Sequence, residues 1–107
     1  DRLGQANALG SLGRVRQAIG EYVEAARLEQ RALDLFEELG DRNGQVFTLI
    51  DLGRVRQAIG EYVEAARLYE EALTLSEGLG ERQKLVKAYL ASLEGEELRT
   101  RRRWRRP

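Results

Sequence analysis

The stretch Leu12–Leu28, LGRVRQAIGEYVEAARL, decides the fold, because the chain repeats it without a change at Leu52–Leu68. The two copies belong to adjoining segments, 1–40 and 41–80, which align without a gap and are identical at 28 of 40 positions. A period of this length is typical of helical repeats, in which each unit buries its apolar face against the next. Such arrays present extended surfaces, so the repeat favours a binding role over catalysis.

Each unit is predicted to form two helices. Apolar residues recur at spacings of three and four over about residues 3–18, and again over residues 22–39. β-branched residues are few and no hairpin dipeptide is present, which argues against strands. We therefore predict an all-α fold in which antiparallel helix-turn-helix repeats stack as a short right-handed α-solenoid.

The ends of these helices carry recognisable signals. Gly20 and Gly40 follow the two apolar segments, and glycine accepts the left-handed conformation that ends a helix. Asp1 and Asp41 precede the first helix of each unit and are predicted to cap it. The second unit is expected to stop at the equivalent glycines, Gly60 and Gly80.

Two kinds of position inside the first helices bear on packing. Gly13 and Gly53 lie within predicted helix, where glycine costs about 1 kcal/mol relative to alanine. Their repetition indicates that another helix packs closely against the backbone there. Leu12 and Leu52 are both expected in the seam between helices, where truncation to alanine costs about 2–5 kcal/mol.

The period divides the chain into four parts. Residues 1–40 and 41–80 are the two repeats, 81–98 a C-terminal capping helix and 99–107 a basic tail. The capping helix is a degenerate half repeat, and its apolar face consists of Leu85, Val86, Tyr89, Leu90 and Leu93. Gly95 is a position at which this helix could end early.

Composition excludes several kinds of site. The chain has no cysteine and no histidine, so disulfides, thiolate nucleophiles, imidazole bases and the common zinc sites are excluded, and neither a metal nor a cofactor is expected. No apolar run approaches the roughly 20 residues of a membrane span and no signal peptide is visible, so we expect a cytoplasmic location. The chain lacks methionine and begins in register with the repeat, which suggests a piece of a longer array, or a processed or engineered chain.

The net charge of zero hides an asymmetry. Residues 1–80 carry 9 basic and 14 acidic side chains, whereas residues 81–107 carry 9 basic and 4 acidic ones. The basic tail holds Arg99, Arg101, Arg102, Arg103, Trp104, Arg105 and Arg106. Arginines around a tryptophan suit phosphate contact and base stacking, so contact with nucleic acid or another anionic polymer is an alternative function. A solvated chain end explains the same residues, and nucleic acid is disfavoured as a partner.

Three features of the repeat are shared with a known family. They are the pair Leu12–Gly13, the turn Gly20–Glu21–Tyr22, and the small residues Ala25 and Ala32, all of which recur in the second unit. On these residues the repeat resembles the tetratricopeptide repeat, in a longer 40-residue variety. The resemblance covers residues 1–80 well and residues 81–94 weakly.

Two positions depart from the family pattern. Arg16 and Arg56 stand where the first helix usually has a tyrosine, and an arginine stem can pack while its head reaches water or a carboxylate. Glu29 stands where the second unit has Tyr69, at the family's later aromatic position. The sequence leaves open where the two arginine heads lie.

The resemblance implies a scaffold that binds a protein or peptide. In the family, the first helices of successive repeats line a concave groove that holds peptides or partner helices. The positions carried over to this chain are Asn7, Ser11, Arg14, Gln17, Phe47, Ile50, Asp51, Arg54, Gln57 and Lys87. Arg14 and Arg54 could hold acidic groups through bidentate hydrogen bonds, so acidic partners are anticipated. Phe47 and Ile50, if exposed together, are the expected apolar anchors.

Two other classes of function compete with a binding scaffold. An enzyme is not expected, because carboxylates such as Glu21 and Glu24 alternate with arginines as on a solvated helix, and no histidine or cysteine activates a hydroxyl. Self-association into a homo-oligomer, by end stacking or helix swapping, is the alternative, because no polar helix precedes the first unit.

Overall fold

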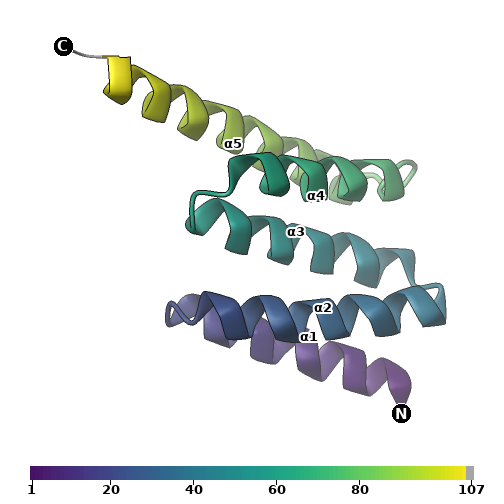
Figure 1. Ribbon diagram of the computed structural model, residues 1–107. Coiled ribbons are helices and arrows are strands. Elements are labelled where there is room, and N and C mark those ends of the chain that lie inside the picture. The colour runs from purple at the N-terminus through teal and green to yellow at the C-terminus, as the bar shows by residue number, and fades with distance from the viewer. Residues whose placement is uncertain (106–107) are drawn as a thin grey trace.

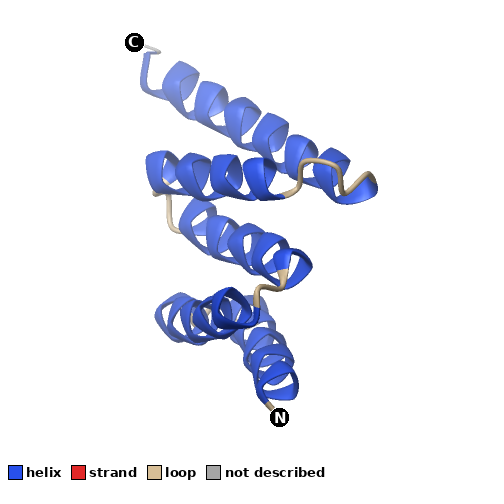
Figure 2. Ribbon diagram, turned by 90° about the vertical axis from the view of Figure 1, so that its right-hand side faces the viewer, coloured by secondary structure: helices blue, strands red, loops and turns tan. Residues whose placement is uncertain are grey.

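The computed structural model describes residues 1–105, and within them it contains five helices and no strand. The helices are α1 (Arg2–Ala18), α2 (Tyr22–Leu39), α3 (Arg42–Ala58), α4 (Tyr62–Leu75) and α5 (Glu81–Arg105). They follow one another in antiparallel layers that place the two ends of the chain at opposite ends of the stack (Figure 1). A second view shows the same tiers joined only by short loops (Figure 2). The all-α helical-repeat solenoid is therefore confirmed.

The turn within each unit depends on one glycine and one ion pair. Gly20 and Gly60 both adopt a φ of 83°, a conformation that side chains other than glycine rarely take. Across the first turn Arg16 Nη1 donates to Glu21 Oε2 at 2.9 Å, and Arg56 repeats the contact with Glu61 at 3.1 Å. The heads of the two unusual arginines therefore close the turns of their own units.

The helix starts agree with the sequence. Asp41 caps α3 by accepting a hydrogen bond from the Gly44 backbone N–H at 2.9 Å, and Asp1 accepts from Gly4 at the start of α1. These contacts satisfy backbone donors that have no partner inside the helix. Both predicted N-caps are confirmed.

The core consists mainly of leucine and valine from α2, α3, α4 and α5. Its largest buried cluster is Leu33, Val46, Leu49, Ile50, Leu52, Leu68, Ala72 and Val86. Gly13 and Gly53 let the second helix of each unit approach the first, because a Cβ there would collide with Glu29 or Tyr69 respectively. The close helix contact predicted from the repeated glycines is confirmed.

The end of α4 differs from the sequence prediction. The helix stops at Leu75 rather than continuing to Gly80, since Ser76 and Gly78 replace Phe36 and Glu38 of the first unit. Gly78 takes a φ of 80°, and the Arg42 guanidinium donates to the carbonyls of Leu75 and Glu77 at 2.8 Å each. An arginine from the start of α3 thus satisfies carbonyls that the helix end leaves free.

The fifth helix is longer than expected. It passes through Gly95 without a break and ends at Arg105, so the boundary proposed between a capping helix and a tail falls inside one helix. Its buried anchors are Val86 and Leu93. Of the proposed tail residues, Arg106 lies outside the described residues, as do the side chains of Trp104 and Arg105.

The two copies of the repeated stretch differ in how deeply their residues are buried. Leu52 is 4% exposed and Val55 1% exposed, whereas their copies Leu12 and Val15 are 50% and 56% exposed. The difference arises because α2 precedes α3 and packs on it, whereas no helix of the structure precedes α1. The expectation that Leu12 and Leu52 are equally buried in a seam is therefore wrong for Leu12.

Truncation of these two leucines should have unequal effects. Leu52→Ala removes buried methyl groups and leaves a cavity, so it should lower the free energy of unfolding by about 2–5 kcal/mol. Leu12→Ala, at a half-exposed site, should lower it by less than about 1 kcal/mol. Urea unfolding followed by circular dichroism measures both values. Equal losses would contradict the assignment of separate environments.

Candidate partner-binding groove

A hollow of about 610 Å³ lies between the first helices of the two units and α5. We call it the groove. Its wall consists of Ala6, Asn7, Gly10, Ser11 and Arg14 from α1, Phe36 from α2, Gly44, Phe47, Thr48, Ile50, Asp51 and Arg54 from α3, and Leu85 and Tyr89 from α5. Gly10 contributes no side chain to this wall, and a Cβ added there would meet only Arg14 Nη1, at 4.0 Å.

The structure brings together seven of the ten residues proposed from the sequence. Asn7, Ser11, Arg14, Phe47, Ile50, Asp51 and Arg54 all line the groove. Gln17 and Gln57 line a smaller hollow of about 240 Å³ beside it, together with Glu96. Lys87 is exposed and lines neither hollow, and α5 contributes Leu85 and Tyr89 to the groove instead.

A charged cluster crosses the groove. Asp51, whose side chain is only 8% exposed, accepts from Arg14 Nη1 at 3.3 Å and lies 3.9 Å from Arg54 Nη1. Arg14 also donates to the Ser11 hydroxyl at 3.2 Å. Burial raises the pKa of Asp51, while the two arginines lower it. Asp51 therefore partly neutralises the positive charge of Arg14 and Arg54. The sequence did not predict these ion pairs.

An aromatic pair attaches α5 to the second unit. The rings of Tyr69 and Tyr89 stack with their centroids 5.7 Å apart, and Arg54 lies 5.7 Å from the Tyr89 centroid. The Tyr69 hydroxyl donates to Gln57 Oε1 at 2.9 Å. These contacts fix the wall of the groove that α5 provides, and they hold Arg54 over an aromatic face.

The two proposed apolar anchors do not form an exposed pair. Ile50 is 3% exposed and belongs to the core, because α3 turns it toward the interior of the stack. Phe47 is 42% exposed, and its ring is partly covered by Arg82, whose guanidinium lies 5.1 Å from the ring centroid. Of the two proposed anchors, Phe47 alone therefore offers apolar surface to a partner. Leu85 of α5 adds apolar surface on the same rim of the groove.

Glu29 is the notable residue that sequence reasoning did not place at a site. It is fully buried, and neither carboxyl oxygen has a hydrogen-bond partner within the described chain. Burial, followed by the charge of Asp51, raises the pKa of Glu29 from 4.5 to about 8, against the opposing effect of Arg14. The sequence contains a signal for this residue, because Glu29 occupies the aromatic position at which the second unit has Tyr69.

The described residues contain no cluster of acidic side chains arranged to hold a metal ion. Across residues 1–105, no helix combines the length and apolar character that crossing a membrane requires.

Stacked helix pairs with a groove along their first helices define a helical-repeat protein. Comparison with protein families matches residues 4–78 to the tetratricopeptide repeat, and the chain belongs to that family. Its repeats are generally scaffolds for protein interaction and typically not enzymes. No curated protein matches the chain.

Ionisation of Glu29 should make stability depend on pH. The Glu29 carboxyl of the unfolded chain loses its proton near pH 4.5, whereas the folded chain keeps that proton up to about pH 8. The contribution of Glu29 to the free energy of unfolding is therefore fully present below pH 4.5 and is lost as pH rises through about 8. Relative to Glu29→Gln, the native chain should therefore lose up to about 4 kcal/mol over this interval. Urea unfolding at a series of pH values measures the difference.

Glu70→Gln provides the matched control, because Glu70 is the exposed neighbour of Tyr69 on α4. Its difference from the native chain should stay constant over the same pH range. A constant difference for Glu29→Gln as well would show that this carboxyl is not held in a buried site.

Proposed function

We propose that the chain is an interaction scaffold that holds an acidic peptide or partner helix in the groove. The observation that carries the proposal is the meeting of Arg14 and Arg54, from different units, over one buried aspartate. Both arginine side chains remain about half exposed, at 52% and 44%. Each guanidinium has five N–H donors, and Arg14 uses only two of its five in the hydrogen bonds described above.

The charge of the groove favours an anionic group. Because the pKa of Glu29 is raised to about 8, its carboxyl is largely neutral at pH 7. Two arginines then face Asp51 as the one other acidic group of the cluster, which leaves the cluster with a net positive charge. A carboxylate from a partner could accept two parallel hydrogen bonds from either arginine.

The variation between the repeats supports the same surface. The residue pairs Asn7/Phe47, Gly10/Ile50 and Ser11/Asp51 differ between the units, and all six residues line the groove. The flanking stretch Leu12–Leu28, which includes Arg14, is copied unchanged. Within Leu12–Leu28 every residue is thus kept, while the three groove positions that precede this stretch differ, as they would in a surface adapted to a particular partner.

An acidic group beside an apolar one is the chemistry that fits. Phe47 and Leu85 leave apolar surface on the rim, next to the arginines. A peptide that places a leucine or phenylalanine close to an aspartate or glutamate would contact both features. Enzymatic activity is no part of this proposal.

The test uses an array of short peptides in which acidic and apolar residues are varied, probed with the chain itself. Arg14→Gln and Arg54→Gln should each weaken binding of the selected peptides about tenfold or more, since charge-assisted hydrogen bonds contribute about 1.5–3 kcal/mol. Arg31→Gln is the control, because Arg31 lines a separate hollow between α1 and α2 and does not line the groove. Selected peptides that bind both groove variants as tightly as the native chain would refute the proposal.

The basic end of α5 remains a weaker alternative. Arg101 donates to Glu97 at 2.7 Å, so part of its charge is neutralised within the helix. Contact of this end with an anionic polymer stays a prediction, as do the cytoplasmic location and the origin of the chain in a longer array.

A further inference from the structure

The groove continues into two smaller hollows along α1, α3 and α5. The first of these has about 370 Å³ and is lined by Arg14, Gln17, Ala18, Tyr22, Arg54 and Ala58. It shares both arginines with the groove, and it shares Gln17, Arg54 and Ala58 with the hollow of about 240 Å³ that contains Glu96. Because neighbouring hollows have wall residues in common, the three form one continuous depression, which we call the channel.

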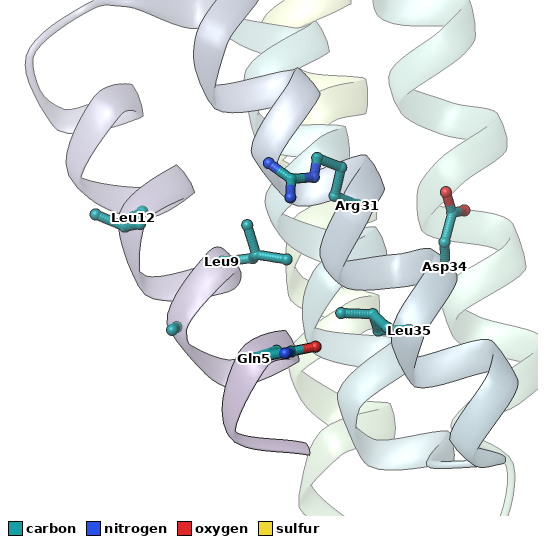
Figure 3. Close-up of a pocket in the computed structure, with 7 residues that line it drawn as sticks. Gln5, Leu9, Leu12, Arg31, Asp34 and Leu35 are labelled. Atoms are coloured by element: carbon teal, nitrogen blue, oxygen red, sulfur yellow. The ribbon is translucent and has the colours of Figure 1, made fainter. Parts of the chain in front are cut away.

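A fourth hollow, of about 540 Å³, lies between α1 and α2 and is separate from the channel. Figure 3 shows Leu9 and Leu35 facing each other across it, with Arg31 and Asp34 on α2 beside Leu35. None of the residues that line this hollow also lines the channel. Its charged side chains therefore supply controls for any contact assigned to the channel.

The contacts between α3 and α5 show how the walls of the channel run. In order along both helices, these contacts join Phe47 to Arg82, Arg54 to Tyr89, and Gln57 to Glu96. Because the order is the same on both helices, α3 and α5 run in the same direction. The channel therefore has two distinct ends, one near the start of both helices and one near the end of α3.

The chemistry of the channel changes from one end to the other. Near the start of α3 and α5, Phe47 and Leu85 leave apolar surface exposed. Arg54 follows Phe47 by seven residues, which is about 10 Å along the helix, and it lies with Arg14 where the groove meets the next hollow. Beyond the arginines, Glu96 is the one acidic residue among the described residues that line the two smaller hollows.

Glu96 carries a negative charge that is not paired with a cation within the described chain. Its Oε2 accepts from Gln57 Nε2 at 2.7 Å and its Oε1 accepts from the Tyr62 hydroxyl at 3.1 Å, and both donors are uncharged. None of the ion pairs found within residues 1–105 includes it. Arg99, one turn further along α5, instead places Nη1 3.6 Å from where a Cβ on Gly95 would stand. The carboxylate is thus fixed in position, with acceptor capacity left for a basic group.

We propose that the channel selects an extended peptide in which an apolar, an acidic and a basic residue follow one another in that order. This selection rests on the proposed function, because Arg14 and Arg54 hold the acidic residue. The apolar residue contacts Phe47 and Leu85, and the basic residue pairs with Glu96. The charges of the peptide are then complementary to those of the channel at both positions.

The size of the channel sets the conformation and spacing of the peptide. One turn of a helix about 10 Å across occupies roughly 420 Å³, more than either of the two smaller hollows, so an extended chain fits better. At about 3.3 Å per residue, the apolar and acidic residues then stand about three positions apart. Glu96 lies one to two helical turns beyond Arg54, as measured along α3 and α5 respectively. The basic residue therefore follows the acidic one by about two or three positions.

Fluorescence anisotropy with two synthetic peptides of the same composition tests the order. Each holds one leucine, one aspartate and one lysine in a glycine-serine background at these spacings, and the second has the aspartate and lysine exchanged. The native chain should bind the first about fivefold more tightly, the effect of one partly exposed ion pair. Equal binding, or tighter binding of the second, would overturn the proposal. Changing the aspartate of the first peptide to asparagine tests the proposed function separately, because unchanged affinity would refute the acidic contact itself.

Glu96→Gln tests the contact with the basic residue, because it removes the charge and keeps the size of the side chain. The native chain should prefer the first peptide about threefold over a version with glutamine in place of lysine, whereas Glu96→Gln should bind both equally and still require the aspartate. Asp34→Asn is the matched control, because Asp34 accepts from Gln30 Nε2 at 3.0 Å in the fourth hollow. It should behave like the native chain. A Glu96→Gln chain that keeps the preference for lysine would overturn the proposal.

Discussion

The packing of α2 between α1 and α3 is the contact on which the rest of the structure depends. From this position α2 completes the first unit and also covers the apolar side of α3. Leu52 is buried only because that cover is present, as the exposure of its copy Leu12 shows. The groove follows from the same contact, because α2 sets the spacing that brings Arg14 of α1 to Asp51 of α3.

The contact between the two helices of a unit differs in chemistry between the two units, although the residues occupy equivalent positions. In the second unit, Tyr69 packs on Gly53 and stacks on Tyr89, and its hydroxyl donates to Gln57. In the first unit the same position holds Glu29, a buried carboxyl without a hydrogen-bond partner in the described chain. A neutral Glu29 preserves both the packing and the positive charge of the groove, so one residue links stability to the chemistry of binding.

Local signals predicted most of the fold. The N-caps and turn glycines were correctly assigned because each acts within a few residues of its own position. The burial of Ile50 and the exposure of Leu12 were not, because each depends on which helix packs against that side of its own helix. The early end of α4 was also missed, although Ser76 and Gly78 mark it in the local sequence. For the groove, the sequence identified Arg14, Asp51 and Arg54 as lining residues but not their ion pairs, since the contact between Arg14 and Asp51 joins residues far apart in the chain.

Amide hydrogen exchange tests the central claim most directly, namely that the neighbouring helix rather than the local sequence determines burial. Residues 12–18 and 52–58 have the same sequence and therefore closely similar intrinsic exchange rates. At a concentration where the chain is monomeric, residues 52–58 should exchange at least about tenfold more slowly, because opening α3 breaks contacts on both of its sides. Equal protection of the two segments would contradict the account.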